Sequence, residues 1–207
     1  MPKLSVKAFS ELLGLPAYEQ VRILYEQKYP KRQPQVFKIP YYAQSLRAIR
    51  EYYRSGCDTA QLRTAEARVA HIRLDSQRDN NLRVIRQFEH GSQRNRALIV
   101  APRQRRSATL HSVELTLQFD LEGSESSAER FLLYNTRAAP IGEETARTTL
   151  ELAQWVLGQA GKLVSLGSIE YVDLPSDKAY RYSKPRASTL KHASNTAGII
   201  TTLWPTI

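Results

Sequence analysis

The stretch Val113-Glu114-Leu115-Thr116-Leu117-Gln118-Phe119 alternates apolar and polar side chains, and it decides the class of fold that the sequence predicts. A period of two places the apolar residues on one face of a half-buried β-strand. Short apolar segments at 97–100, 131–134 and 168–174 predict further strands, and 179–182 is the expected hairpin partner of the last one. The second half of the chain is therefore expected to contain a sheet.

Helices are expected on both sides of these strands. Residues 17–28 and 42–53 show helical spacing of apolar side chains, as do 62–72, a short segment from 82, 143–158 and 188–204. Asp79-Asn80-Asn81 looks like a break between two helices, and Gly123 to Ser127 looks like a turn or flexible loop. Prolines at 30, 34 and 40 predict an extended connector.

Together these elements predict an α+β protein in which helices flank a mixed β-sheet. We divide it into a helical N-terminal extension, residues 1–53, and a basic α/β core domain, residues 54–207, although the whole chain could be one domain. Its 207 residues are enough for a proper core. One cysteine excludes an intrachain disulfide framework, and the sequence has neither a membrane-spanning apolar run nor an apolar signal core. We expect a cytoplasmic protein with no membrane partner.

Charge indicates the class of partner. Between Arg54 and Arg106 the chain has twelve arginines, no lysine and five acids, so this segment carries +7 of the formal net charge of +10. The planar guanidinium group grips phosphate or carboxylate with two hydrogen bonds. Such a segment favours a polyanion or an acidic protein surface as partner, and nucleic acid is the commonest polyanion.

The order of elements over residues 59–174, one helix, three strands, one helix and one strand (αβββαβ), resembles the core of the PD-(D/E)XK, or restriction-endonuclease-like, superfamily. Members of that superfamily hold Mg²⁺ with an Asp near the end of the second core strand and with an acid-x-Lys motif on the third, whose lysine positions the attacking water. The resemblance places the Asp at Asp120 and the acid-x-Lys motif at Asn135-Thr136-Arg137.

This sequence departs from the superfamily at two of these positions. Asn135 has no carboxylate, and Arg137 cannot be deprotonated and is bulkier than lysine. The resemblance therefore implies a degenerate site that binds without cutting, so that no catalytic residue and no metal ligand is assigned. Mg²⁺ would be a cofactor only if the protein is a nuclease. The alternative is that Asp120 and Glu122 simply begin a turn.

Two groups of arginines are the candidate nucleic-acid contacts. If 97–101 is a strand, the clusters at its two ends lie about 15 to 20 Å apart, a span that suits phosphates along one strand of a duplex. A second row is expected on the helical face opposite Leu62 and Val69. The first group is Arg94, Arg96, Arg103, Arg105 and Arg106, and the second is Arg63, Arg68 and Arg78. Alternatively, arginines of the first group pair with acids such as Glu89 and Glu114.

Seven of the eleven tyrosines lie between Tyr18 and Tyr53, where they could stack on bases, anchor a protein interface or cap a small helical core. The sequence thus favours a non-catalytic nucleic-acid-binding subunit of a DNA- or RNA-handling assembly, with defence against foreign DNA as one setting suggested by fold analogy. A metal-dependent nuclease using Asp120 and an adaptor for an acidic protein partner are the alternatives.

Overall fold

The computed structural model describes residues 1–29 and 41–207, and it confirms an α+β fold. The expected proline-rich connector lies outside the described residues. Seven α-helices occur in the described part: α1 Val6–Leu13, α2 Ala17–Lys28, α3 Ala43–Arg54, α4 Thr59–Ala70, α5 Asp75–His90, α6 Glu143–Gln159 and α7 Ala187–Leu203. Three short 3₁₀ turns accompany them: η2 Ser92–Asn95, η3 Leu166–Ser168 and η4 Leu174–Ser176.

The smaller sheet contains the alternating stretch that defined the predicted fold. It has the strand order β1-β4-β3, with β1 Lys3–Ser5, β3 Arg105–Leu110 and β4 Val113–Gln118. In β4 the apolar side chains of Val113, Leu115 and Leu117 are buried, as the period of two requires. β1 pairs with β4 in parallel, so the N-terminus of the chain is a strand of this sheet.

The larger sheet has the order β2-β5-β6-β7-β8. Its strands are β2 Ile99–Ala101, β5 Leu121–Glu125, β6 Ala128–Asn135, β7 Ile169–Asp173 and β8 Lys178–Tyr180. β2, β5 and β6 are antiparallel neighbours, whereas β6 and β7 are parallel and are connected through α6. The hairpin at 169–180 confirms the predicted pairing of the last two strands.

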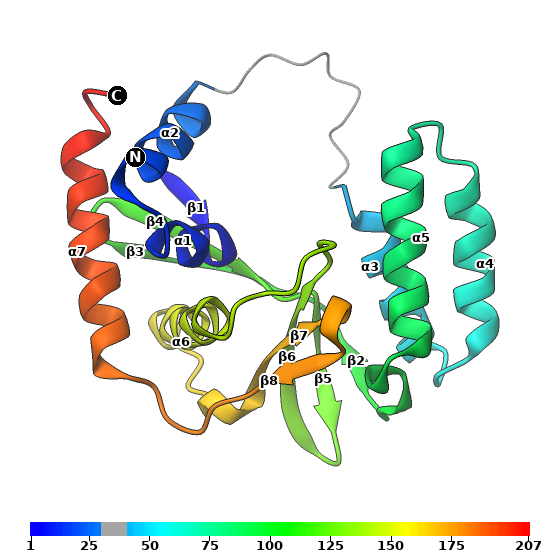
Figure 1. Ribbon diagram of the computed structural model, residues 1–207. Coiled ribbons are helices and arrows are strands. Elements are labelled where there is room, and N and C mark those ends of the chain that lie inside the picture. The colour runs from blue at the N-terminus through cyan, green and yellow to red at the C-terminus, as the bar shows by residue number, and fades with distance from the viewer. Residues whose placement is uncertain (30–40) are drawn as a thin grey trace.

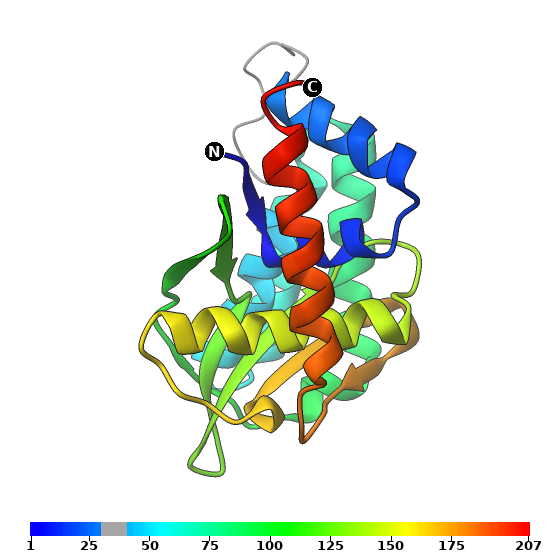
Figure 2. The same ribbon diagram turned by 90° about the vertical axis from the view of Figure 1, so that its left-hand side faces the viewer.

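Two hydrophobic cores lie on opposite faces of the larger sheet (Figure 1). Successive side chains of β6 alternate between them: Phe131 and Leu133 belong to the core beneath α1, α6 and α7, and Leu132 and Tyr134 to the core beneath α3, α4 and α5. When the molecule is turned by 90° about the vertical axis, α6 and α7 are seen to cross each other in front of the sheet (Figure 2). A strand buried on both faces thus joins the two halves of the molecule.

Several predicted boundaries were wrong. Asp79-Asn80-Asn81 is not a break, because α5 runs from Asp75 to His90 and the buried Asn81 side chain accepts a hydrogen bond from Ser45 N at 2.9 Å. Of the turn expected at 123–127, residues 123–125 belong to β5, and Ser126 and Ser127 form the turn. Strands β1, β3 and β5 were not predicted. With β3 and β5 included, five strands, β2 to β6, precede α6 within 59–174 where three were expected.

No helix in residues 1–29 and 41–207 has the length and apolar character needed to cross a membrane.

Candidate nucleic-acid interface

Asp120 lies between β4 and β5 and is held by two donors. Its Oδ2 accepts a hydrogen bond from the Tyr134 backbone N at 2.8 Å and lies 2.7 Å from Lys7 Nζ. The same ammonium group donates to the Tyr134 carbonyl at 2.9 Å. The side chains of Lys7 and Asp120 are 31% and 13% exposed, so solvent screens this ion pair only partly.

The local fold explains why Lys7 reaches this position. β1 is fixed beside β4, and the Ser5 hydroxyl then caps α1 by accepting a hydrogen bond from Ala8 N at 3.1 Å. Lys7 is therefore in the first turn of a helix that begins at the edge of the sheet. Burial by itself would lower the pKa of Lys7, but the Asp120 carboxylate raises that pKa above its ordinary value.

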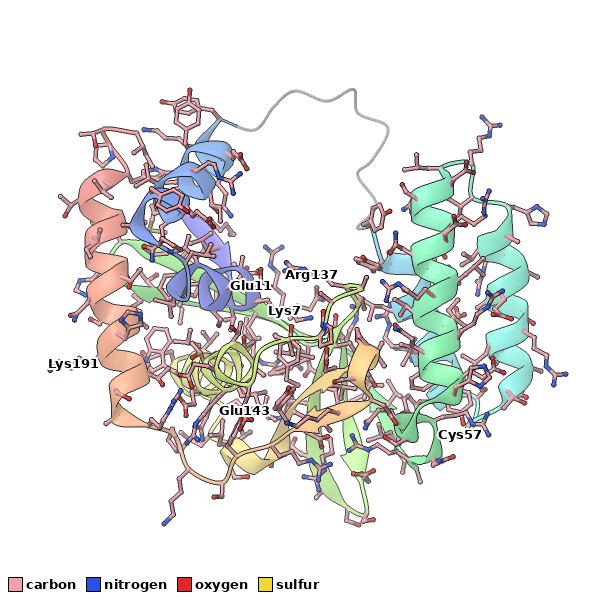
Figure 3. The ribbon with its side chains drawn as sticks, viewed as in Figure 1. Lys7, Glu11, Cys57, Arg137, Glu143 and Lys191 are labelled. Atoms are coloured by element: carbon pink, nitrogen blue, oxygen red, sulfur yellow. The ribbon has the colours of Figure 1, made fainter. Side chains whose placement is uncertain are left out.

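Glu11, one turn further along α1, links the helix to the loop after β6. Its Oε2 lies 2.8 Å from Arg137 Nη2. Figure 3 shows Lys7, Glu11 and Arg137 close together near the middle of the view, where α1 faces the loop after β6. Burial raises the pKa of the Tyr171 hydroxyl, and Lys7 and Arg137 are the cations that oppose this shift.

Of the three residues that the superfamily resemblance indicates, Asn135 is turned toward a different partner. Its Nδ2 donates to Asp173 Oδ1 at 2.6 Å, and its Oδ1 accepts from Arg137 N at 3.1 Å. Asp120 Oδ2 is likewise engaged, because it accepts hydrogen bonds from Lys7 Nζ and Tyr134 N. No group of three His, Cys, Asp or Glu side chains suited to a metal occurs in 1–29 and 41–207.

The three strands that were expected before α6 do not share one sheet, because β4 belongs to the smaller sheet and β2 and β6 belong to the larger one. The succession α5, β2, β5, β6, α6, β7 has one helix, three antiparallel strands, a helix and a parallel strand, with the β3–β4 hairpin inserted and placed in the smaller sheet. Asp120 directly precedes the middle strand of this succession. Membership of the superfamily stays a prediction, because the order of elements carries no evidence about chemistry.

A cluster of positive charge lies beside Asp120. Arg50 of α3 donates through Nη1 to the Asp120 carbonyl at 3.4 Å, and Arg103 of the β2–β3 connection and Arg54 are its cationic neighbours. Burial, with the nearby charges of Arg103 and Arg54, lowers the pKa of Arg50 to about 10. These three residues, here called the α3 arginine cluster, have no carboxylate within ion-pair distance in the part of the chain that the structure describes.

Two of the predicted phosphate contacts are instead internal ion pairs. Arg96 binds Glu125 at 2.7 and 2.8 Å and Glu170 at 2.7 and 3.0 Å, while Arg106 binds Glu122 at 2.9 and 3.1 Å. The Arg96 and Arg106 side chains are only 12% and 7% exposed. We therefore remove Arg96 and Arg106 from the candidate surface. Their partners are not the acids expected from the sequence, because Glu114 pairs with Lys3.

The remaining predicted arginines differ in whether they form ion pairs within the protein. Arg68 pairs with Glu51, and Arg78 pairs with Asp75 and Asp79. Arg94 donates to the Glu89 carbonyl at 3.0 Å. Three of the predicted residues are exposed and have no carboxylate partner in the described residues: Arg63, Arg103 and Arg105.

Lys7 and Arg50 were not expected beside Asp120, because both lie far from it along the chain. Lys7 belongs to an N-terminal strand–helix junction whose three-residue strand has no detectable period. Arg50 is part of an amphipathic helix, where an arginine is ordinarily solvated. Only the pairing of β1 with β4 and the packing of α3 beside β2 bring them to Asp120.

The sequence matches no protein-family model, and it matches no protein in the curated set with which it was compared.

Proposed function

We propose that this protein binds nucleic acid through the phosphate backbone, without cutting it, and that the α3 arginine cluster is the centre of the contact surface. The observation that supports this proposal is that Arg50, Arg54 and Arg103 lie together without an ion-pair partner among the described residues. Burial and the charges of Arg103 and Arg54 lower the pKa of Arg50, and the Asp120 and Glu51 carboxylates offset this only in part. The cluster joins Arg50 of α3 to Arg54 and Arg103, two members of the arginine-rich segment that have no ion-pair partner in the described residues.

Like charges held close together destabilise the free protein, and a bound anion relieves this repulsion. Phosphate oxygens accept paired hydrogen bonds from guanidinium, and phosphates repeat along a nucleic-acid strand. Arg105, exposed on β3 two residues after Arg103, would extend the contact along the backbone. Contacts of this kind position the strand and do not read its sequence.

Binding without cleavage is part of the same proposal. Asp120 is the carboxylate that a nuclease would need, and here its Oδ2 is held by Lys7 and by a backbone N–H group. In a cell the protein would act in the cytoplasm as a subunit that holds DNA or RNA for an assembly. Cleavage that requires magnesium or manganese and is abolished by Asp120→Ala would instead support the nuclease alternative.

A pair of double variants tests the proposal. Arg54→Ala/Arg103→Ala removes two cations of the cluster, and Arg63→Ala/Arg73→Ala removes two exposed, carboxylate-free cations at α4 and just after it. Both lower the net charge by two. We expect the first to weaken binding of a fluorescent oligonucleotide at about 50 mM salt at least tenfold and the second to change it less than about threefold.

If the two double variants lose the same amount of affinity for the oligonucleotide, net charge alone drives binding. That result would contradict the assigned surface. If the unmodified protein binds neither duplex DNA, single-stranded DNA nor RNA at low salt, the proposal fails. That result would favour an acidic protein partner for the same arginines.

A further inference from the structure

One face of the β3–β4 hairpin is open to solvent and carries only polar side chains. Side chains alternate between the two faces along each strand, and those of the other face are buried. The open face, here called the outer sheet face, consists of three cross-strand pairs: Arg105 with Gln118, Ser107 with Thr116, and Thr109 with Glu114. Its four members outside the pair Thr116 and Glu114 are exposed, and these two are half-buried.

The outer sheet face continues the α3 arginine cluster. Its first pair, Arg105 and Gln118, lies at the end of the hairpin where β3 begins and β4 ends. Arg103 comes just before β3, and its charge acts on Arg50. Arg50 in turn donates to the carbonyl of Asp120, just after β4. The cluster and the outer sheet face therefore meet at this end of the hairpin.

The charges and the hydrogen-bond donors of the outer sheet face suit phosphate. Arg105 has no carboxylate partner in the described residues, whereas the one acid of this face, Glu114, is neutralised by Lys3 at 2.6 Å. The Ser107 and Gln118 side chains make no hydrogen bond to another residue in the part of the chain that the structure describes. Hydroxyl, amide and guanidinium groups are the usual side-chain donors to phosphate oxygens.

This surface offers no aromatic ring on which a base could stack. None of the six residues of the outer sheet face is aromatic. The two tyrosines of α3 beside the cluster, Tyr52 and Tyr53, are each 3% exposed, and their hydroxyls donate to the Arg94 and Gln93 carbonyls at 2.9 and 2.6 Å. Proteins that bind single strands combine a basic groove with aromatic side chains that stack on the bases. A duplex, whose bases stack on one another, does not need such rings.

We propose that the outer sheet face and the α3 arginine cluster together bind the backbone of a nucleic-acid duplex in preference to a single strand. From residue 105 to residue 109, β3 spans about 13 Å at roughly 3.3 Å per residue. That length covers more than one phosphate, because each strand of a duplex carries one phosphate per about 3.4 Å of helix axis. This inference rests on the proposed function and narrows its ligand.

Fluorescence anisotropy with a labelled duplex of about 20 base pairs, and with one of its strands alone, tests the preference. We expect the native protein to bind the duplex at least about fivefold more tightly than the single strand at about 100 mM salt. The measurement uses the full chain, and the two probes share the same label and sequence.

Charge changes at Ser107, in the middle pair of the outer sheet face, test the surface. Ser107→Glu should weaken duplex binding at least about fivefold, and Ser107→Lys should strengthen it at least about threefold. Opposite shifts at one position do not arise from misfolding. The matched controls are Ser188→Glu and Ser188→Lys, at an exposed serine of α7, which packs against the other face of the smaller sheet. These should change duplex affinity less than about twofold.

The outcomes separate this inference from the proposed function. If the duplex binds but the Ser107 variants behave like the Ser188 variants, the outer sheet face is not part of the contact surface. If the single strand binds as tightly as the duplex or more tightly, the duplex preference is wrong while phosphate binding by the α3 arginine cluster stands. If neither probe binds, the proposed function fails and this inference fails with it.

Discussion

Lys7 Nζ lies 2.7 Å from Asp120 Oδ2, and this ion pair fixes the first helix of the chain to the start of a strand more than a hundred residues later. Because both partners are mostly removed from solvent, loss of one leaves the other charge without compensation. We expect Lys7→Met to lower the free energy of unfolding by about 1 to 3 kcal/mol.

Urea denaturation of Lys7→Met, Asp120→Asn and the double variant measures this coupling. Asp120→Asn keeps an oxygen that can accept from Tyr134 N, so the double variant should be less destabilised than the two single losses added together. Additive losses would show that Lys7 and Asp120 do not stabilise each other.

A second prediction concerns Glu170, which is fully buried and lies within 3.5 Å of three arginines: Arg96, Arg130 and Arg181. Glu170→Ala would leave these cations partly unpaired beneath the sheet, and we expect it to cost about 3 to 5 kcal/mol of stability. The exposed Arg86–Glu66 pair supplies the control, because Arg86→Ala should change stability by less than about 1 kcal/mol. Equal effects of the two substitutions would contradict the structural role of this network.

The same network predicts a pH dependence. The Arg96 guanidinium lowers the pKa of Glu125 to about 2. A carboxyl group whose pKa is lower in the folded than in the unfolded protein stabilises the fold fully above its unfolded pKa, near 4.3, and loses that contribution as the pH falls toward 2. Between these pH values we expect the native protein to lose up to about 3 kcal/mol of stability through this group.

Free energies of unfolding measured from pH 6 to pH 2 will check this prediction with Glu125→Gln as comparison. The variant should be less stable at pH 6 and should lose less stability on acidification. Parallel curves for the two proteins would exclude Glu125 as a source of the acid sensitivity.

Within the arginine-rich segment, we expect some arginines to contribute to the stability of the fold and others to contribute to nucleic-acid binding. Arg96→Ala removes an internal ion pair and should destabilise the protein by about 3 kcal/mol or more. Arg103→Ala changes an exposed side chain and should alter stability by less than about 0.5 kcal/mol while weakening oligonucleotide binding. Thermal unfolding and fluorescence anisotropy on the same two samples distinguish these roles.

The helices and the central strands could be predicted from the sequence because their patterns of apolar and polar side chains extend over enough residues to be recognised. The range 17–28 of α2 agrees with the structure, and the alternation in β4 identified its buried face. Gly123 was misleading: it lies inside β5, where a Cβ would overlap the Ile99 carbonyl oxygen of the neighbouring strand. A glycine required by close backbone approach has the same sequence signature as one in a turn.

The candidate surface was less predictable. Asp120 pairs with Lys7 and Arg137 pairs with Glu11, and the charges of Asp120 and Arg137 both act on Tyr171. The arginine-rich segment did not predict which of its arginines would be buried. Arg96 and Arg106 form ion pairs with glutamates on β5 and β7, which are distant from them in the sequence. Pairing between strands decides whether an arginine faces phosphate or an internal glutamate, and a single sequence does not contain that register.

The dependence of nucleic-acid affinity on salt tests the central claim most directly. The logarithm of the association constant for duplex DNA should fall linearly with the logarithm of salt concentration, with a slope set by the number of phosphates neutralised. We predict that Arg54→Ala/Arg103→Ala makes this slope shallower by about 1 to 2, whereas Arg63→Ala/Arg73→Ala leaves it unchanged. An affinity that does not depend on salt, or the same slope in the Arg54→Ala/Arg103→Ala variant as in the native protein, would contradict phosphate binding by the α3 arginine cluster.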